Sequence, residues 1–232
     1  MCIVSYLPTD KGFCITSNRD EQIHRPTLKP DVHFYQGKKL IYPKDVELGG
    51  TWFALDPESK KASCLLNAKS TSKSKYPKIT RGRLPIAWLE QGMGCFDNQM
   101  LQTAPFVLIT LEYSHNKTQL SSFFWDGKDL REERLENNQA YLWCSSSLYE
   151  PEKNEAFQKS FRRELDLIDE NNNLLSFHQK VAQPLNSSIY SEKNRDLQTV
   201  SITSLTSTAK NYHLDYFDLK LKTEGFHRIN LN

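Results

Sequence analysis

Short apolar runs recur along the chain, and their spacing predicts mostly β-strands. "CIVSYL" and "GFCITS" flank the turn residues "PTDKG" and indicate a hairpin. "GGTWFALD" and "KKASCLLN" flank "PES" and indicate a second one. Several runs are apolar on both faces, which is typical of strands buried between layers. Further strands are expected over 104–113, 118–127, 139–147, 197–207 and 213–221.

Three segments carry apolar residues at helical spacing instead. Residues 151–170 place Phe157, Phe161, Leu165 and Ile168 on one face, and Pro151 suits the first turn. Shorter helices are expected over 84–92, where Gly92 ends the helix, and over 173–182. We find no internal repeat and no Gly/Ser linker. The pattern therefore predicts a single α+β domain over 1–232, with two antiparallel sheets and helices outside them.

Composition and charge narrow the function classes. The 232 residues carry a net charge of only +2, which does not favour nucleic acid as a partner. No stretch approaches the roughly 20 apolar residues of a membrane span, and no signal peptide is evident. We therefore expect a cytoplasmic protein without an integral membrane segment. Five cysteines with no CxxC pair, and six unpaired histidines, predict free thiols and no metal site.

The first predicted hairpin brings the chain start beside the polar stretch "NRDE" at 18–21. If the loop centres on Asp10 and Lys11, Cys2 lies opposite Arg19. If Gly12 takes a left-handed bulge position, Cys2 lies opposite Asp20 instead. The apolar pattern does not choose between the two registers. Both bring the Cys2 thiol close to this stretch, because opposed residues share a face of the sheet.

This placement suggests a nucleophile. A start methionine before a small residue is commonly removed, which would leave Cys2 as the first residue. Its α-amino group would titrate near about 7.7–8.0 and could act as the base. Arg19 would draw the thiol toward thiolate, and Asp20 could hold the α-ammonium or the Arg19 guanidinium.

The second hairpin offers the remaining parts of an active site. Asn67, at the end of "LLNAK", falls roughly opposite Gly49 and Gly50, where a side-chain amide could receive an oxyanion. We expect a substrate-binding wall that includes Trp52. Asn18, Glu21, Gly50 and Arg83 complete the predicted substrate-binding residues.

Several motifs together resemble the NRDE family, whose members are also called transport-and-Golgi-organisation proteins. They are "MC" at the start, "NRDE", "RP" at 25–26, "GGTW" at 49–52, "LLNA" at 65–68 and "RGRL" at 81–84. "SSSLYEPEKNEAF" and "RDLQTVSITSL" extend the likeness over nearly the whole chain.

The resemblance implies a four-layer αββα sandwich of the N-terminal-nucleophile (Ntn) hydrolase type. It places Cys2 at the nucleophile and Arg19 and Asp20 in the motif that holds it, with Asn67 at an oxyanion position. Arg195 falls near the family's late arginine, but the serines around it differ.

Two functions follow. One is a cysteine hydrolase of a small-molecule amide or thioester, with no cofactor. The other is a carrier of haem or of an acyl-CoA-like amphiphile in the same cleft. The basic segment 69–83 could then bind an anionic group of the ligand, and His24 is the one candidate haem ligand.

Overall fold

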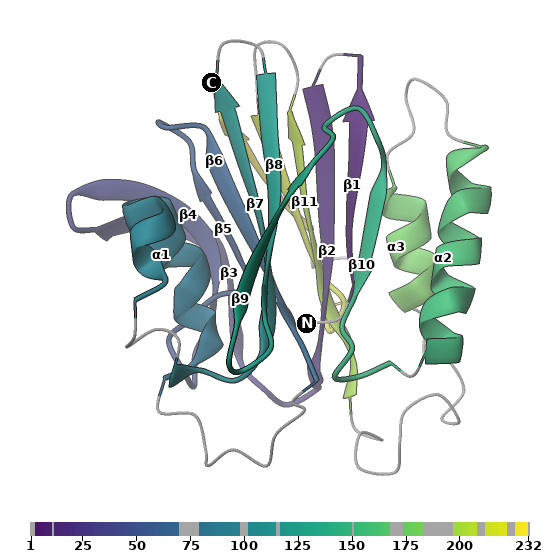
Figure 1. Cartoon of the computed structure of the whole chain (residues 1–232), viewed down its shortest axis with the longest axis horizontal. Coiled ribbons are helices and arrows are strands. Elements are labelled where there is room, and N and C mark those ends of the chain that lie inside the picture. Colours follow the sequence, from purple (N-terminus) through teal and green to yellow (C-terminus); the bar gives the residue numbers. More distant parts are fainter. Residues whose placement is uncertain are drawn as a thin grey trace. The chain divides into compact units, whose positions relative to one another are not determined.

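The computed structural model describes residues 3–10, 12–69, 79–97, 102–114, 117–149, 151–167, 174–182, 197–207, 212–221 and 226–231. These residues form two compact units. The first is built from 1–24 and 138–232, and the second from 25–137. Each unit contains one antiparallel sheet, and the described helices divide between them (Figure 1).

The described residues of the first unit form a six-stranded sheet and two helices. The strand order is β10 (Tyr141–Cys144), β1 (Ile3–Thr9), β2 (Gly12–Gln22), β11 (Leu197–Ser207), β12 (Tyr212–Asp218) and β13 (Phe226–Leu231). Helices α2 (Pro151–Leu165) and α3 (Leu175–Ala182) belong to the same unit.

Both helices pack on the face of this sheet that carries the odd-numbered side chains of β1. Ile3 and Leu7 from β1 join Phe157 and Phe161 from α2 and Phe177 from α3 in one apolar cluster. The remaining buried members are Cys14, Leu142, Tyr149 and Leu174. Because side chains alternate along a strand, the even-numbered residues of β1 face away from these helices.

In the second unit, the part of the chain that the structure describes forms a seven-stranded meander with one α-helix. Its strands follow one another in chain order: β3 (Thr27–Tyr35), β4 (Lys38–Asp45), β5 (Phe53–Asp56), β6 (Lys61–Asn67), β7 (Phe106–Ser114), β8 (Lys117–Trp125) and β9 (Leu130–Leu135). Helix α1 (Leu84–Gln91) lies between two 3₁₀ turns, η1 (Arg81–Arg83) and η2 (Gly92–Cys95).

Helix α1 is held against the sheet at both ends. Pro85 stands in its first turn, and the Ser63 hydroxyl of β6 donates to the Pro85 carbonyl at 2.9 Å. Gly92 follows the helix with φ +56°, a conformation that favours glycine at a C-terminal cap. Lys38 Nζ of β4 donates to the Leu89 carbonyl at 3.1 Å, close to that end.

The predicted α+β class and both hairpins are confirmed, as are the three α-helices among the described residues. Ile168 lies outside the described part of the chain. Strands β3, β4, β9 and β13 were not predicted from the sequence. A single domain and the four-layer αββα packing stay predictions. Within the described residues, no helix has both the length and the apolar character needed to cross a bilayer.

Candidate active site

The first hairpin adopts the register in which paired residue numbers add up to 21. Ile3 pairs with Asn18, and the ladder continues to Thr9 with Gly12. Gly12 has φ +151°, and a Cβ there would lie 2.5 Å from the Ser207 carbonyl oxygen of β11. This glycine therefore permits a close approach of β11 and does not form the alternative bulge. Cys2 itself lies outside the described residues.

The "NRDE" stretch divides its side chains between the two faces of β2. Asn18 and Asp20 turn toward the face that carries the helices, where their contacts come from α3 and from the segment before α2. Strand alternation places Arg19 and Glu21 on the opposite face. All but Glu21 are almost fully buried, with at most 3% of each residue exposed.

Asn18 forms a two-point contact with a buried histidine of α3. Its Nδ2 donates to the His178 backbone carbonyl at 3.1 Å, and its Oδ1 lies 2.7 Å from His178 Nδ1. An amide oxygen can only accept, so Nδ1 must carry the proton. The other ring nitrogen, Nε2, then accepts from the Ser5 hydroxyl at 2.7 Å. This network joins β1, β2 and α3 next to the first described residue of β1.

His178 is neutral in this position. The residue is fully buried, and desolvation lowers the pKa of its imidazole to about 3. The arrangement Ser5–His178–Asn18 has the hydrogen-bond order of a catalytic serine triad. All three residues are at most 1% exposed, however, so the Ser5 hydroxyl is closed to a substrate and the network is structural.

Asp20 is fixed by two hydroxyl groups that the sequence analysis missed. The Tyr149 hydroxyl donates to Oδ2 at 2.5 Å, and the Thr199 hydroxyl of β11 donates to Oδ1 at 2.6 Å. Both are short hydrogen bonds to the carboxylate oxygens, one from each side chain. Asp20 thus ties β2 to β11 and to the start of α2, which is a positioning role.

Arg19 lies on the face opposite the helices, among polar residues of three strands. It pairs with Ser201 of β11, and its guanidinium is 4.0 Å from the Glu21 carboxylate. Burial raises the pKa of Tyr216 to about 12, and the positive charge of Arg19 opposes that shift. A guanidinium that is only 3% exposed has little water to screen it, so its field acts strongly on groups nearby.

The second unit contains the other predicted residues. Asn67 ends β6 and pairs with Phe106 of β7. Directly after it, the Ala68 N–H donates to the Pro105 carbonyl at 3.1 Å, and Arg81 Nη1 donates to the same carbonyl at 2.9 Å. Burial lowers the pKa of Arg81. Arg81 is therefore a cation close to the end of the Asn67 strand, a position that its place in the basic segment did not reveal.

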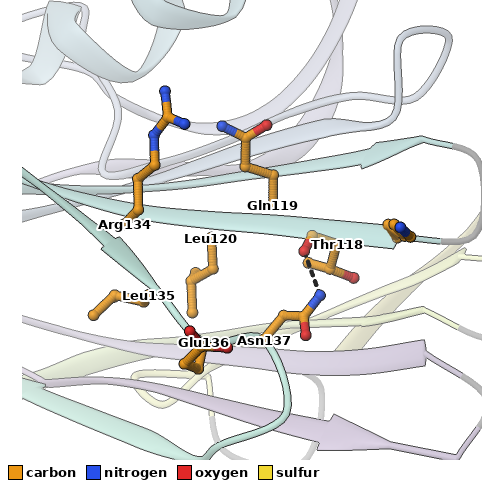
Figure 2. Close-up of a pocket in the computed structure, with 8 residues that line it drawn as sticks. Thr118, Gln119, Leu120, Arg134, Leu135, Glu136 and Asn137 are labelled. Carbon is orange, nitrogen blue, oxygen red and sulfur yellow. Dashed lines mark hydrogen bonds between the residues drawn. The ribbon is translucent and has the colours of Figure 1, made fainter.

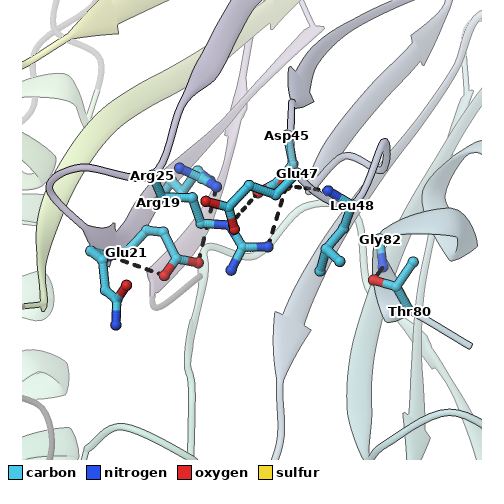
Figure 3. Close-up of polar contacts among 9 residues, drawn as sticks. Arg19, Glu21, Arg25, Asp45, Glu47, Leu48, Thr80 and Gly82 are labelled. Carbon is cyan, nitrogen blue, oxygen red and sulfur yellow. Dashed lines mark hydrogen bonds and ion pairs between the residues drawn. The ribbon is translucent and has the colours of Figure 1, made fainter. Parts of the chain in front are cut away.

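The turn that carries Gly49 and Gly50 is organised by Asp45. Arg25 donates to both carboxylate oxygens of Asp45, at 2.8 and 3.3 Å, and Asp45 Oδ1 also accepts from the Leu48 N–H (Figure 3). The Asp45 N–H donates to the Gly50 carbonyl at 2.8 Å. Asp45 thus links the two motifs: its carboxylate pairs with Arg25 of "RP", and its N–H bonds to Gly50 of "GGTW".

Gly50 in turn permits a close approach of the "RGR" turn. The Thr51 N–H donates to the Gly82 carbonyl at 2.8 Å, and a Cβ on Gly50 would lie 2.7 Å from the Gly82 carbonyl atoms. The neighbour that requires a glycine here is therefore backbone. Trp52 follows in the core and is 3% exposed. Its predicted contact with a substrate stays untested.

Arg83 lines a cavity of about 440 Å³ between α1 and the β3–β4 pair, together with Gly49. A second groove runs along β8 and β9, where Asn137 Nδ2 donates to the Thr118 carbonyl (Figure 2). None of the predicted site residues that the structure describes lines this second groove.

The four described cysteines are poor nucleophiles. Cys14, Cys64 and Cys95 are buried, and Cys144 is half-buried. Desolvation raises the pKa of Cys95 and that of Cys144 to about 12. At pH 7 their thiolate fraction is then about 10⁻⁵, against a few per cent for an ordinary thiol.

The predicted residues therefore fall into two groups. Asn18, Arg19, Asp20 and Glu21 lie together on β2 of the first unit, and Gly50, Trp52, Asn67 and Arg83 lie in the second. Cys2, Arg195 and residues 70–78 of the basic segment lie outside the described residues. His24 is exposed at the end of the first unit.

Fold and motifs together define an α+β protein with two antiparallel sheets. Its "NRDE" stretch lies on β2, which pairs with β1. The family model for Transport and Golgi organisation 2 matches residues 1–215, so the chain belongs to this family. This confirms the resemblance seen in the sequence motifs. No curated protein matches the chain.

Proposed function

We propose that the protein is an N-terminal cysteine hydrolase, in which Cys2 attacks the carbonyl carbon of an amide or thioester. The observation that carries this proposal is the register of the first hairpin. Ile3 pairs with Asn18, so one further step along the same ladder would oppose positions 2 and 19. Opposed residues share a face, which would set the Cys2 thiol beside the buried Arg19.

The charge of Arg19 supports activation of that thiol. A neighbouring arginine lowers a cysteine pKa from about 8.5 into the range of about 3.5–7.5. Glu21, 4.0 Å from the guanidinium, partly offsets this effect. Asn18 and Asp20 hold β2 in place from the helix face through His178 and Tyr149, so they act as positioning residues.

The reaction then needs no group beyond the chain and water. The thiolate forms a C–S bond with the carbonyl carbon, and the leaving amine or thiol takes a proton from the α-ammonium group. Water, deprotonated by the α-amine, attacks the resulting thioester. The C–S bond of the thioester breaks, the acid leaves, and the Cys2 thiolate and the α-ammonium group are restored. Asn67 remains the candidate oxyanion donor from the sequence, testable through Asn67→Ala.

Intact-mass measurement of the natively expressed chain tests the proposal. We expect loss of Met1, followed by a mass increase on Cys2 after incubation with a panel of acyl thioesters and amides. Cys2→Ala should abolish the increase, whereas Cys144→Ala should not. Retention of Met1 together with no acyl adduct would contradict the hydrolase.

The Cys2→Ala variant also distinguishes the hydrolase from the second candidate, a carrier of haem or of an acyl-CoA-like amphiphile. A carrier would bind its ligand equally well with Cys2→Ala and would release it unchanged. Haem titration of the wild type and of Cys2→Ala, followed by absorbance, measures this binding. His24→Ala tests the candidate haem ligand.

A further inference from the structure

The cavity between α1 and the β3–β4 pair is a built concavity of the second unit. Its volume of about 440 Å³ lies in the range of small-molecule sites. Tyr42 and Lys44 of β4 line one side, and Ile86 and Glu90 of α1 line the other. Every lining residue belongs to residues 35–97, so the cavity requires only this unit.

Two cations, Lys44 and Arg83, belong to the lining. Lys38, on the same strand as Lys44, donates to carbonyls at the end of α1 and so holds the helix. Among the residues that the structure describes, neither the Lys44 ammonium nor the Arg83 guanidinium forms an ion pair. Side chains that face a concavity without a partner are suited to an anionic ligand.

Aromatic and aliphatic groups supply the rest of the surface. Tyr35 and Tyr42 both line the cavity, and Tyr42 is held by a stacked His33 ring at 4.0 Å. Tyr42 is 6% exposed, so its ring is fixed by packing. Ile86 adds apolar surface from the helix. A flat apolar body can pack against such a wall.

Acidic residues at the same cavity limit the charge of the ligand. Glu90 and Asp97 both belong to the lining. Two carboxylates near two cations would repel a doubly charged phosphate more strongly than a singly charged carboxylate. Burial raises the pKa of Glu90, and the charge of Lys38 opposes this shift.

We propose that this cavity is a second binding site, which takes a small aromatic monocarboxylate. The carboxylate is held by Lys44 and Arg83, and the ring lies against Tyr35 and Tyr42. This proposal does not rest on the chemistry proposed for Cys2, and it assigns to Arg83 a ligand other than the hydrolase substrate.

Three probes of one shape test the assignment on the full-length protein. They are 2-naphthoate, the neutral 2-naphthamide and the dianionic 2-naphthyl phosphate, each titrated by calorimetry. We expect 2-naphthoate to bind at least tenfold more tightly than either of the others. No binding of 2-naphthoate, or equal binding of the amide, would overturn the proposal. Tighter binding of the phosphate would overturn the monocarboxylate assignment.

Matched variants locate the site. Lys44→Gln should weaken 2-naphthoate binding about tenfold, and Tyr35→Leu about fivefold. Lys39→Gln removes the same charge from the same strand. Because Lys39 lies on the opposite face of β4, this variant should leave binding unchanged. Equal losses for Lys39→Gln and Lys44→Gln would show a non-specific charge effect and contradict the site. Cys2→Ala should bind the probe as the wild type does, which separates this test from that of the hydrolase.

Discussion

Acid should destabilise the first unit through His178, whose ring holds Asn18 and Ser5. The folded-state pKa of about 3 lies below the ordinary value of 6.5. As the pH falls through 6.5, the unfolded chain therefore gains a proton that the folded chain does not accept. Stability is fully present above pH 6.5 and is lost as the pH falls toward 3.

The size of the effect follows from the two pKa values. Each pH unit inside this window costs up to about 1.4 kcal/mol. Between pH 7.5 and pH 5.0 the loss from His178 alone is on the order of 2 kcal/mol. The ring is fully buried, so solvent does not weaken this contribution.

Urea unfolding at the two pH values measures it. The variant His178→Gln should be less stable at pH 7.5 by about 1–3 kcal/mol, because a buried hydrogen-bond partner is lost. Its further loss at pH 5.0 should be smaller than that of the wild type by about 2 kcal/mol. The exposed His24 gives the matched control, and His24→Gln should lose as much as the wild type. If His178→Gln loses as much stability between pH 7.5 and pH 5.0 as the wild type, the assignment of a neutral, buried His178 ring is wrong.

Two further substitutions test the packing around the site. Gly50→Ala should lower the free energy of unfolding by about 1–3 kcal/mol, because its Cβ would overlap the Gly82 backbone. Gly94→Ala is the control: its Cβ would meet only Gln91 at 3.8 Å, so the free energy should change by less than about 0.5 kcal/mol. Equal effects of the two variants in chemical denaturation would disprove the close approach. Tyr149→Phe should cost about 1.5–3 kcal/mol through the lost hydrogen bond to the Asp20 carboxylate, and an unchanged unfolding midpoint would rule out that bond as a stabilising contact.

The strands that the sequence did not reveal are mainly at sheet edges. β3 and β9 are the two edges of the second sheet, and β13 is an edge of the first. Edge strands carry charges and exposed residues that break the alternating pattern. In β9, "LREERL" exposes four charged side chains in a row, and in β3 Pro30 stands at a register shift. Central strands such as β11 were predicted within their observed bounds.

The candidate site was predicted only as far as local pairing reaches. The first hairpin places the start of β1 beside "NRDE" because both strands share one turn. The partners that fix this stretch come from far along the chain: His178 is 160 residues from Asn18, and Tyr149 is 129 residues from Asp20. Neither spacing nor composition carries such contacts, because they depend on how α2 and α3 dock on the sheet. Arg81 likewise became distinct from its basic neighbours only through its contact with Pro105.

The central claim is that Arg19 activates the Cys2 thiol. Its most direct test is the rate of iodoacetamide alkylation of Cys2 in the native protein between pH 5 and pH 9, located by peptide mass spectrometry. The account predicts an apparent pKa below the ordinary value of about 8.5, raised by Arg19→Gln, largely kept by Arg19→Lys and lowered further by Glu21→Gln. An apparent pKa at or above about 8.5 that none of these variants changes would contradict it.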